Sequence, residues 1–334
     1  TGPYRVAVTA RVLLPRPQIR WRTGLRVVGW AVAAILTVVG TISGVGGLGM
    51  IVFLFVVLHG IEVLFPRHDQ PLKRPGLSVD LLWAVVGIWL RIALAGLVLL
   101  VVASVLGLES DADAVSEWEG LFSSQLDQLP PLVHALLGGI LFDFLLYWGH
   151  RLFHTVPVLW RYHAIHHSIR VMDWAVGSRN HPVQEVAFSL VPGLIVIGLG
   201  FDPLTVAGLA LVFVLIMPFI HTNVRWRLWP LRGIVITPEF HHWHHADDQE
   251  AWDKNFSAHL PLWDLLFGTY YMPKDKRPAA YGSPDAVPED FTGQLVYPMA
   301  PKRFQDSLAH PGVAVKIPGG VVFTPAEREV VGSS

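Results

Sequence analysis

Long stretches with almost no charged residues constrain this chain more than any other feature. Residues 27–64 and 79–106 are nearly all apolar, and two further apolar stretches lie at 130–154 and 186–220. A helix crosses the hydrocarbon core of a bilayer with about 20 apolar residues, so each stretch can supply one or two membrane spans. Charged residues make up only 15% of the chain, against roughly a quarter in a soluble domain. The sequence therefore predicts an integral membrane protein.

The lengths of these stretches predict about six membrane passes. The stretch 27–64 is long enough for two spans, and 186–220 reads as a second hairpin that turns at 198–203. The stretches 79–106 and 130–154 supply one span each. All spans are expected to be helices, because backbone polar groups in lipid must be paired within the segment. The predicted fold class is all-α, a polytopic transmembrane helical bundle.

The distribution of charge predicts the orientation of the bundle. Residues 1–25 carry arginines and no acidic residue, since the first acid in the chain is Glu62. An excess of Lys and Arg beside a span marks a cytoplasmic flank. Residues 109–127 hold acids without Lys or Arg and read as an outer loop. Counting spans from the N-terminus puts the end of 130–154, and the histidine-rich segments after it, on the cytoplasmic side.

Three histidine clusters indicate a metal site. The chain contains an HxxxH pattern and two HxxHH patterns, which together hold eight of its 16 histidines: His150 and His154; His163, His166 and His167; His241, His244 and His245. Residues three and four apart share a helix face, so each cluster can direct its imidazoles at one point. Without a metal, so many packed imidazoles would leave many buried donors and acceptors to satisfy. We therefore predict that all eight bind metal.

The ligand type limits the choice of metal. Imidazole suits zinc, copper, iron and nickel, and the absence of Cys excludes thiolate zinc sites and iron–sulfur clusters. Eight nitrogens are too many for one tetrahedral ion, so two ions are expected, and a two-metal site can activate dioxygen or water. Iron fits oxygen chemistry best, with O2 as the co-substrate. Zinc could occupy the same nitrogens in purified protein without supporting redox turnover.

Polar residues near the clusters are candidates for catalytic roles. Asp143 and Tyr147 share a helix face with His150 and His154. Asp143 is predicted to accept the second N–H of a metal-bound imidazole, because ligating histidines usually donate that proton to a carboxylate or carbonyl. Asn255, beyond the third cluster, is a further candidate of this kind. His242 is the odd residue of the His-His-Trp-His-His run, and whether it touches metal stays open.

The pattern resembles the fatty acid hydroxylase/sterol desaturase superfamily. The resemblance rests on the three clusters, on Asp143 seven residues before His150, on Asn255-Phe256, and on the run Pro261 to Thr269, and it covers about residues 130–272. It implies an integral-membrane, non-haem di-iron enzyme that uses O2 and external electrons. It also implies further ligands between the second and third clusters, for which His181 and His221 are the candidates. Whether His181 and Asn223 touch metal stays open.

Charge, apolar length and the resemblance together predict a four-part organisation with a cytoplasmic, histidine-rich di-metal cap. A basic cytoplasmic N-terminal flank (1–25) precedes N-terminal transmembrane helices and an acidic outer loop (26–129). A hydroxylase/desaturase-like catalytic domain (130–272) is followed by a polar cytoplasmic tail (273–334). The expected reaction is hydroxylation or desaturation of a C–H bond in a lipid or sterol-like substrate from the bilayer. The residues do not separate the two reactions, and hydroxylation is favoured by the resemblance alone.

Composition and missing motifs predict the partners. No GxGxxG fingerprint stands between a strand and a helix, so electrons are expected from a separate ferredoxin, cytochrome b5 or reductase. The net charge of -1 and the lack of a basic patch argue against nucleic acid. The excess of Arg over Lys, with abundant Ala, Val, Leu and Gly, is typical of high-GC bacteria. It predicts a multi-pass protein of the bacterial cytoplasmic membrane.

Two other classes of function compete with the oxygenase. A membrane metallohydrolase would use a metal-bound hydroxide, but the first cluster has Arg151 where the HExxH motif of metalloproteases has its glutamate. A metal transporter or sensor without redox chemistry is the other alternative. Transporters place their ligands within spans near the membrane midplane. The histidines of this chain are predicted at span ends.

Overall fold

The computed structural model describes residues 56–71, 73–106 and 120–301. The predicted basic flank, most of the first apolar hairpin, the first part of the acidic loop (109–119) and the tail beyond 301 lie outside these ranges. The chain divides into two units, Thr1–Gly60 and Ile61–Ser334. The features described below belong to the second unit.

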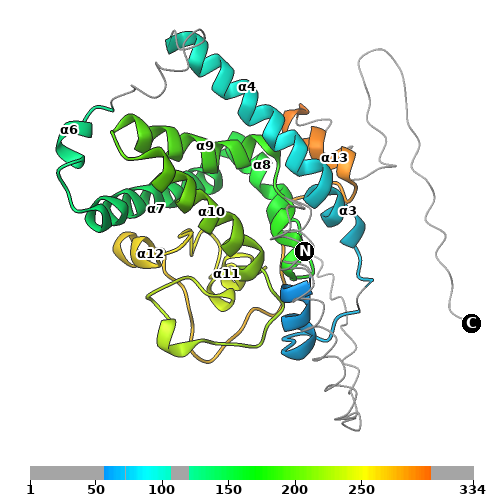
Figure 1. Cartoon of the computed structure of the whole chain (residues 1–334). Coiled ribbons are helices and arrows are strands. Elements are labelled where there is room, and N and C mark those ends of the chain that lie inside the picture. Colours follow the sequence, from blue (N-terminus) through cyan, green and yellow to red (C-terminus); the bar gives the residue numbers. More distant parts are fainter. Residues whose placement is uncertain (1–55, 72, 107–119, 302–334) are drawn as a thin grey trace, which may run out of the picture. The chain divides into compact units, whose positions relative to one another are not determined.

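The described residues of this unit are helical and contain no strand, which confirms the predicted all-α class at this level (Figure 1). Two isolated bridges join Pro66 to Val224 and Ala246 to Tyr281. The longer helices are α4 (Ile88–Leu106), α7 (Pro131–Thr155), α8 (Pro157–His167), α9 (Pro182–Gly198) and α10 (Pro203–Ile220). The shorter ones are α3 (Leu77–Leu82), α6 (Ser123–Leu126), α11 (Pro238–His244), α12 (Leu262–Phe267) and α13 (Phe291–Val296), with single turns η1 (Trp83–Gly87), η2 (Trp174–Ser178), η3 (Trp229–Leu231) and η4 (Tyr297–Met299).

Two helices are long and apolar enough to cross a membrane, by length and composition. One runs over Leu77–Val105, through α3, the π-helical turn η1 and α4, and the other is α7. They confirm helices at two of the predicted spans. Large apolar side chains of α4 and α7, such as Leu100 and Leu132, are about 70% exposed (69% and 70%). Such exposure is expected of helices in contact with lipid, because soluble proteins rarely expose large apolar patches.

The helix pair predicted over 186–220 is present as α9 and α10. Both pack against α7, and Figure 1 shows the three side by side. Phe142 and Leu146 of α7 are buried against Phe188 and Val196 of α9 and Val206 of α10. This apolar core lies beneath the histidine-bearing ends of the helices. A count of six passes remains a prediction.

Proline fixes where the histidine-bearing helices begin. Helices α7, α8, α10 and α11 each begin with a proline, whose fixed φ suits the first helical position. Asp202 and Thr237 cap α10 and α11 by accepting hydrogen bonds from the backbone N–H groups of Thr205 and Phe240. The histidines lie at or just beyond the opposite, C-terminal ends. These ends carry partial negative charge, which favours a bound cation.

Candidate metal centre

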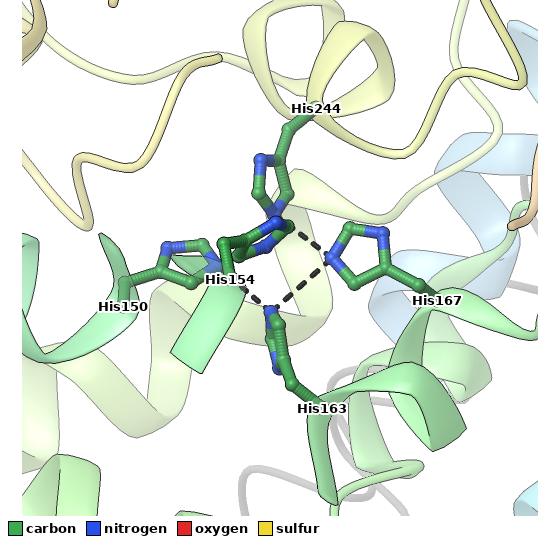
Figure 2. A group of neighbouring side chains, drawn as sticks. All are labelled: His150, His154, His163, His167 and His244. Atoms are coloured by element: carbon green, nitrogen blue, oxygen red, sulfur yellow. Dashed lines mark hydrogen bonds between the residues drawn. The ribbon is translucent and has the colours of Figure 1, made fainter. Parts of the chain in front are cut away.

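Nine histidines lie in two adjacent groups at these helix ends. The first group contains His150, His154, His163, His167 and His244, which Figure 2 shows pointing toward one another, and the second contains His166, His221, His241 and His245. Within each group the candidate ligand atoms all lie within 4.8 Å of one another. The three clusters and His221 therefore converge as the sequence predicts. Metal binding by them is proposed below.

Each HxxHH cluster contributes to both groups. In the second cluster, His163 and His167 point into the first group and His166 into the second. In the third cluster, His244 enters the first group, and His241 and His245 enter the second. The rings of His167 and His245 stack with centroids 4.3 Å apart, so the two groups share a boundary.

Hydrogen bonds on the outer ring nitrogens fix the orientation of the imidazoles. The Nδ1 atoms of four histidines face backbone carbonyl oxygens: His150 faces Phe256 (2.7 Å), His166 faces Arg179 (3.2 Å), His221 faces Met217 (2.6 Å) and His244 faces Lys254 (2.8 Å). His163 Nδ1 faces Oε1 of Gln184 at 3.0 Å. A carbonyl oxygen only accepts, so each of these Nδ1 atoms carries the proton. Their Nε2 atoms therefore carry lone pairs.

These lone pairs face each other at the spacing of metal ligands. Nε2 of His150 lies 2.9 Å from Nε2 of His163, and Nε2 of His166 lies 3.2 Å from Nε2 of His221. Neither nitrogen of either pair has a proton to donate, so the contacts are repulsive without a cation. Nitrogens that lie about 2.0–2.1 Å from one ion are separated by roughly 2.8–3.4 Å, depending on the angle between them. The observed distances fit imidazoles arranged around one ion in each group.

Burial keeps these imidazoles neutral. Removal from water lowers the pKa well below its usual range for His163, His166 and His167, and neighbouring histidines lower it further. Burial also lowers the pKa values of His241, His244 and His245 well below that range. The pKa of His221 falls to about 4. Neutral imidazole is the form that binds metal, so the centre is prepared for a cation at neutral pH.

The metal-free protein is expected to lose stability as the pH falls below about 6.5. Burial lowers the pKa of His221 from 6.5 to about 4, so folding favours its neutral form. Stability from such a group is complete above the higher pKa and is lost as the pH falls toward the lower one. His221 alone accounts for about 2 kcal/mol between pH 7 and pH 5. Thermal unfolding of chelator-treated protein at both pH values measures this, and equal midpoints would contradict burial of neutral imidazoles.

His181, predicted as a ligand, lies outside both groups. It precedes α9, where its Nδ1 accepts a hydrogen bond from the backbone N–H of Val183 (3.2 Å). Its Nε2 faces the carbonyl oxygen of Leu295 at 3.1 Å. Both ring nitrogens therefore have a hydrogen-bond partner, and His181 connects the start of α9 to α13. We do not propose it as a ligand.

His242 and Asn223, which the sequence left open, also lie outside the groups. His242 Nε2 faces the carbonyl oxygen of Thr222 at 3.0 Å, and its Nδ1 lies 2.7 Å from Nη1 of Arg67. The side-chain amide of Asn223 bonds the backbone of His68, at 2.8 and 3.0 Å. His242 therefore connects α11 to Thr222 and Arg67, and Asn223 connects the segment after α10 to His68.

Asp143 does not contact a group histidine, contrary to its predicted role. Its carboxylate accepts from the N–H and the ring of His259, from the N–H of Leu260 and from the indole of Trp263, at 2.8–3.2 Å. It faces the loop that follows the third cluster. Helical spacing predicted which face of α7 carries Asp143, but it could not predict which distant segment packs against that face.

Tyr147 and Asn255, the other predicted catalytic residues, also bond the segment around 255–271. The Tyr147 hydroxyl lies 3.0 Å from Oγ1 of Thr269 and accepts a hydrogen bond from Arg151. Asn255 has the left-handed φ of 59°, and its side chain bonds backbone groups of Phe240 and Tyr271. A catalytic role for Asp143, Tyr147 or Asn255 therefore has no support in the geometry.

Two residues that sequence reasoning passed over hold the ligands in place. Asp264 is fully buried and accepts from the N–H groups of Phe256 and Ser257, both at 2.8 Å, and from the hydroxyl of Thr269. It thereby fixes the Phe256 carbonyl that bonds His150. Gln184 bonds His163 directly. The sequence offered one signal for each residue. Asp264 is the lone acid within the apolar run 260–267, and Gln184 is an amide three residues after His181.

Two pockets reach the histidines. A pocket of about 210 Å³ touches His154, His167 and His244 of the first group, and its polar lining includes Asp253 and Asp285. A smaller apolar pocket of about 30 Å³ touches both groups, with Leu146 and Phe188 in its wall. The centre thus has one polar approach and one apolar approach.

Comparison with known proteins agrees with this arrangement. Residues 135–269 match the sequence model of the Fatty acid hydroxylase family. The matched segment runs from α7 to the end of α12 and contains all nine grouped histidines. No solved structure matches the chain.

The chain is similar to several curated lipid enzymes. It is 33% identical to ornithine lipid hydroxylase OlsE of Rhizobium tropici over 53% of each chain. It is 33% identical to alkylglycerol monooxygenase of Homo sapiens, over 48% of this chain and 35% of that protein. Very-long-chain aldehyde decarbonylase GL1-6 of Oryza sativa subsp. indica is 31% identical over 41% of this chain and 23% of that protein.

These alignments with curated relatives are partial. The chain spans about half the length of OlsE and a smaller share of the other relatives. The family match and the nine converging histidines rest on the same helices. Residues 135–269, which are less than half of the chain, therefore match the Fatty acid hydroxylase family over the same histidine pattern that resembles it in the sequence.

Proposed function

We propose that this protein is a membrane-bound, non-haem di-iron oxygenase that hydroxylates a C–H bond of a lipid. The observation that carries the proposal is the pair of histidine groups, in which lone-pair Nε2 atoms converge at metal-ligand spacing. Five imidazoles would hold one ion and four the other. Hydroxylation is preferred to desaturation because two similar proteins are a lipid hydroxylase and a monooxygenase.

The chemistry of the donor set favours iron. Two iron ions would supply dioxygen activation and oxidation of an unreactive C–H bond, given electrons from a donor. The protein itself orients the imidazole rings and shields them from bulk water. Carbonyl oxygens and Gln184 hold the imidazoles in one tautomer, and burial of the rings keeps bulk water away. The small apolar pocket would receive the reacting segment of the lipid.

We further propose a multi-pass protein of the bacterial cytoplasmic membrane with the metal centre at the cytoplasmic face. The exposed apolar side chains of α4 and α7 support contact with lipid. The segment 130–272 would be the catalytic domain, with 1–25 as a basic cytoplasmic flank and 26–129 as further membrane helices. The polar segment after 273 contributes to the centre, because Gly282 and Asp285 line the larger pocket.

Electrons are proposed to come from a separate ferredoxin, cytochrome b5 or reductase. The larger pocket supports an approach of that partner to the first group, since three ligands form part of its wall. Trp160 also lines that pocket, with its ring centroid 5.0 Å from that of His154. Its indole N–H donates to Asp285 at 2.9 Å, which holds the ring in place.

The first test is metal content, measured by elemental mass spectrometry on protein purified gently in detergent. About two ions per chain with iron among them are expected, as for a two-metal centre. Iron-loaded protein is then incubated with a bacterial lipid extract, a reductant and ¹⁸O2, and a lipid that gains one ¹⁸O atom is sought. One ion or none would contradict the two-metal centre. Two ions without ¹⁸O incorporation, but with lipid hydrolysis, would establish the metallohydrolase instead.

A further inference from the structure

The apolar pocket between the two histidine groups has an almost entirely apolar wall outside the ligands. Its volume is about 30 Å³, and since about 10–15 Å³ of cavity volume suffices for one water-sized group, the pocket has room for about two such groups. Four ligands form part of the wall: His150 and His163 from the first group, His166 and His241 from the second. The remaining lining residues are Leu146, Gln184, Phe188, Met217, Ile220, Ser257 and Ala258. A carbon atom in this pocket would lie beside both groups.

Ser257 lines this pocket, and its buried hydroxyl has no hydrogen-bond partner within the described part of the chain. The residue is 2% exposed. Gln184, the other polar residue of the wall, uses both ends of its amide, on His163 and Asn180. A buried hydroxyl without a partner costs about 1–3 kcal/mol, so such groups normally have one.

The backbone that carries this hydroxyl is fixed relative to a ligand. The backbone N–H of Ser257 donates to Asp264 at 2.8 Å, as does that of Phe256. The Phe256 carbonyl in turn holds the ring of His150 at 2.7 Å. Ser257 therefore belongs to the same rigid turn that orients a ligand of the first group. A group held this firmly can select the substrate atom placed beside the metal centre.

We propose that the Ser257 hydroxyl forms a hydrogen bond with an oxygen atom of the substrate, next to the carbon that is oxidised. The inference rests on the proposed function and defines its substrate class more closely. The substrate is a long-chain lipid that is oxidised near an oxygen-bearing end, at a hydroxyl, ether or carbonyl group. A plain methylene segment in the pocket would bury Ser257 without a partner, so the site disfavours mid-chain positions.

Two lipids that differ by one oxygen atom test this inference. Equilibrium binding of tritiated hexadecan-1-ol and heptadecane is measured with the iron-loaded full chain in detergent under argon, so that no turnover occurs. Ser257→Ala is expected to weaken binding of the alcohol about 5-fold, the value of one neutral hydrogen bond, and to leave alkane binding unchanged. If Ser257→Ala weakened the binding of both lipids alike, or changed the binding of neither, the inference would be overturned.

Controls separate this result from a folding defect and from failure of the proposed function. Ser189→Ala removes a hydroxyl that donates to the Glu185 carbonyl, outside the pocket wall, and should change neither affinity. The unfolding midpoint of Ser257→Ala should not fall, because no protein hydrogen bond is lost. If the wild type binds neither lipid, the inference is overturned, and ¹⁸O incorporation still decides the proposed function on its own.

Discussion

His166→Ala is expected to lower the metal content of the protein from about two ions per chain to about one and to abolish lipid oxidation. The second group has four histidines, so this change leaves three imidazoles. It also removes the nitrogen that lies 3.2 Å from Nε2 of His221. Because both ions are needed for oxygen chemistry at such a centre, activity should fall by more than about 100-fold. Elemental analysis and the ¹⁸O assay measure the two effects.

His134→Ala is the matched control for this variant. His134 lies near the N-terminal end of α7, far along the helix from His150, and its Nε2 accepts from the N–H of Asp202 at 3.4 Å. Its removal should leave metal content and turnover unchanged. If His166→Ala kept its full metal content and its activity, the assignment of the second group as a metal site would be wrong.

Asp264→Ala is expected to destabilise the protein by about 3 kcal/mol or more, since it leaves three buried donors without their acceptor. Those donors are the N–H groups of Phe256 and Ser257 and the hydroxyl of Thr269. The Phe256 carbonyl would lose its fixed position, so we also expect the variant to bind metal less tightly in the first group. Denaturant unfolding and metal titration test the two parts.

Two further substitutions define this effect. Asp264→Asn keeps one acceptor oxygen and should fall between wild type and Asp264→Ala. Asp202→Ala removes a helix cap at an exposed site and should cost only about 1 kcal/mol. If Asp264→Ala were as stable as Asp202→Ala, Asp264 would not be the structural centre of the loop after the third cluster.

The sequence alone predicted the helices and most of the histidines of the site. Apolar length gave the helices at 79–106 and 130–154 and the pair at 186–220, because hydrophobic patterning is local information. The spacing of three and four residues gave the shared faces of the clusters. Nine of the ten predicted ligands lie in the two groups, and their role as ligands remains a proposal.

The predicted roles of His181 and Asp143 find no support in the structure, because both residues bond segments that are distant in the sequence. His181 bonds the backbone of Leu295, 114 residues away, and Asp143 bonds His259, 116 residues away. No spacing rule reports such pairings. A polar residue near a histidine cluster looks the same in the sequence whether it serves the metal centre or a neighbouring loop.

By itself, the sequence determined which apolar stretches form helices and which histidines share a face, because helix geometry depends on neighbours along the chain. Only the tertiary structure decided how the histidines are divided. It directs His163 and His167 to one group and His166 to the other, and it leaves the Ser257 hydroxyl unpaired between them. The reason is physical: the direction of a ring or hydroxyl is set by carbonyls and carboxylates from distant segments, and these meet only when the chain is folded.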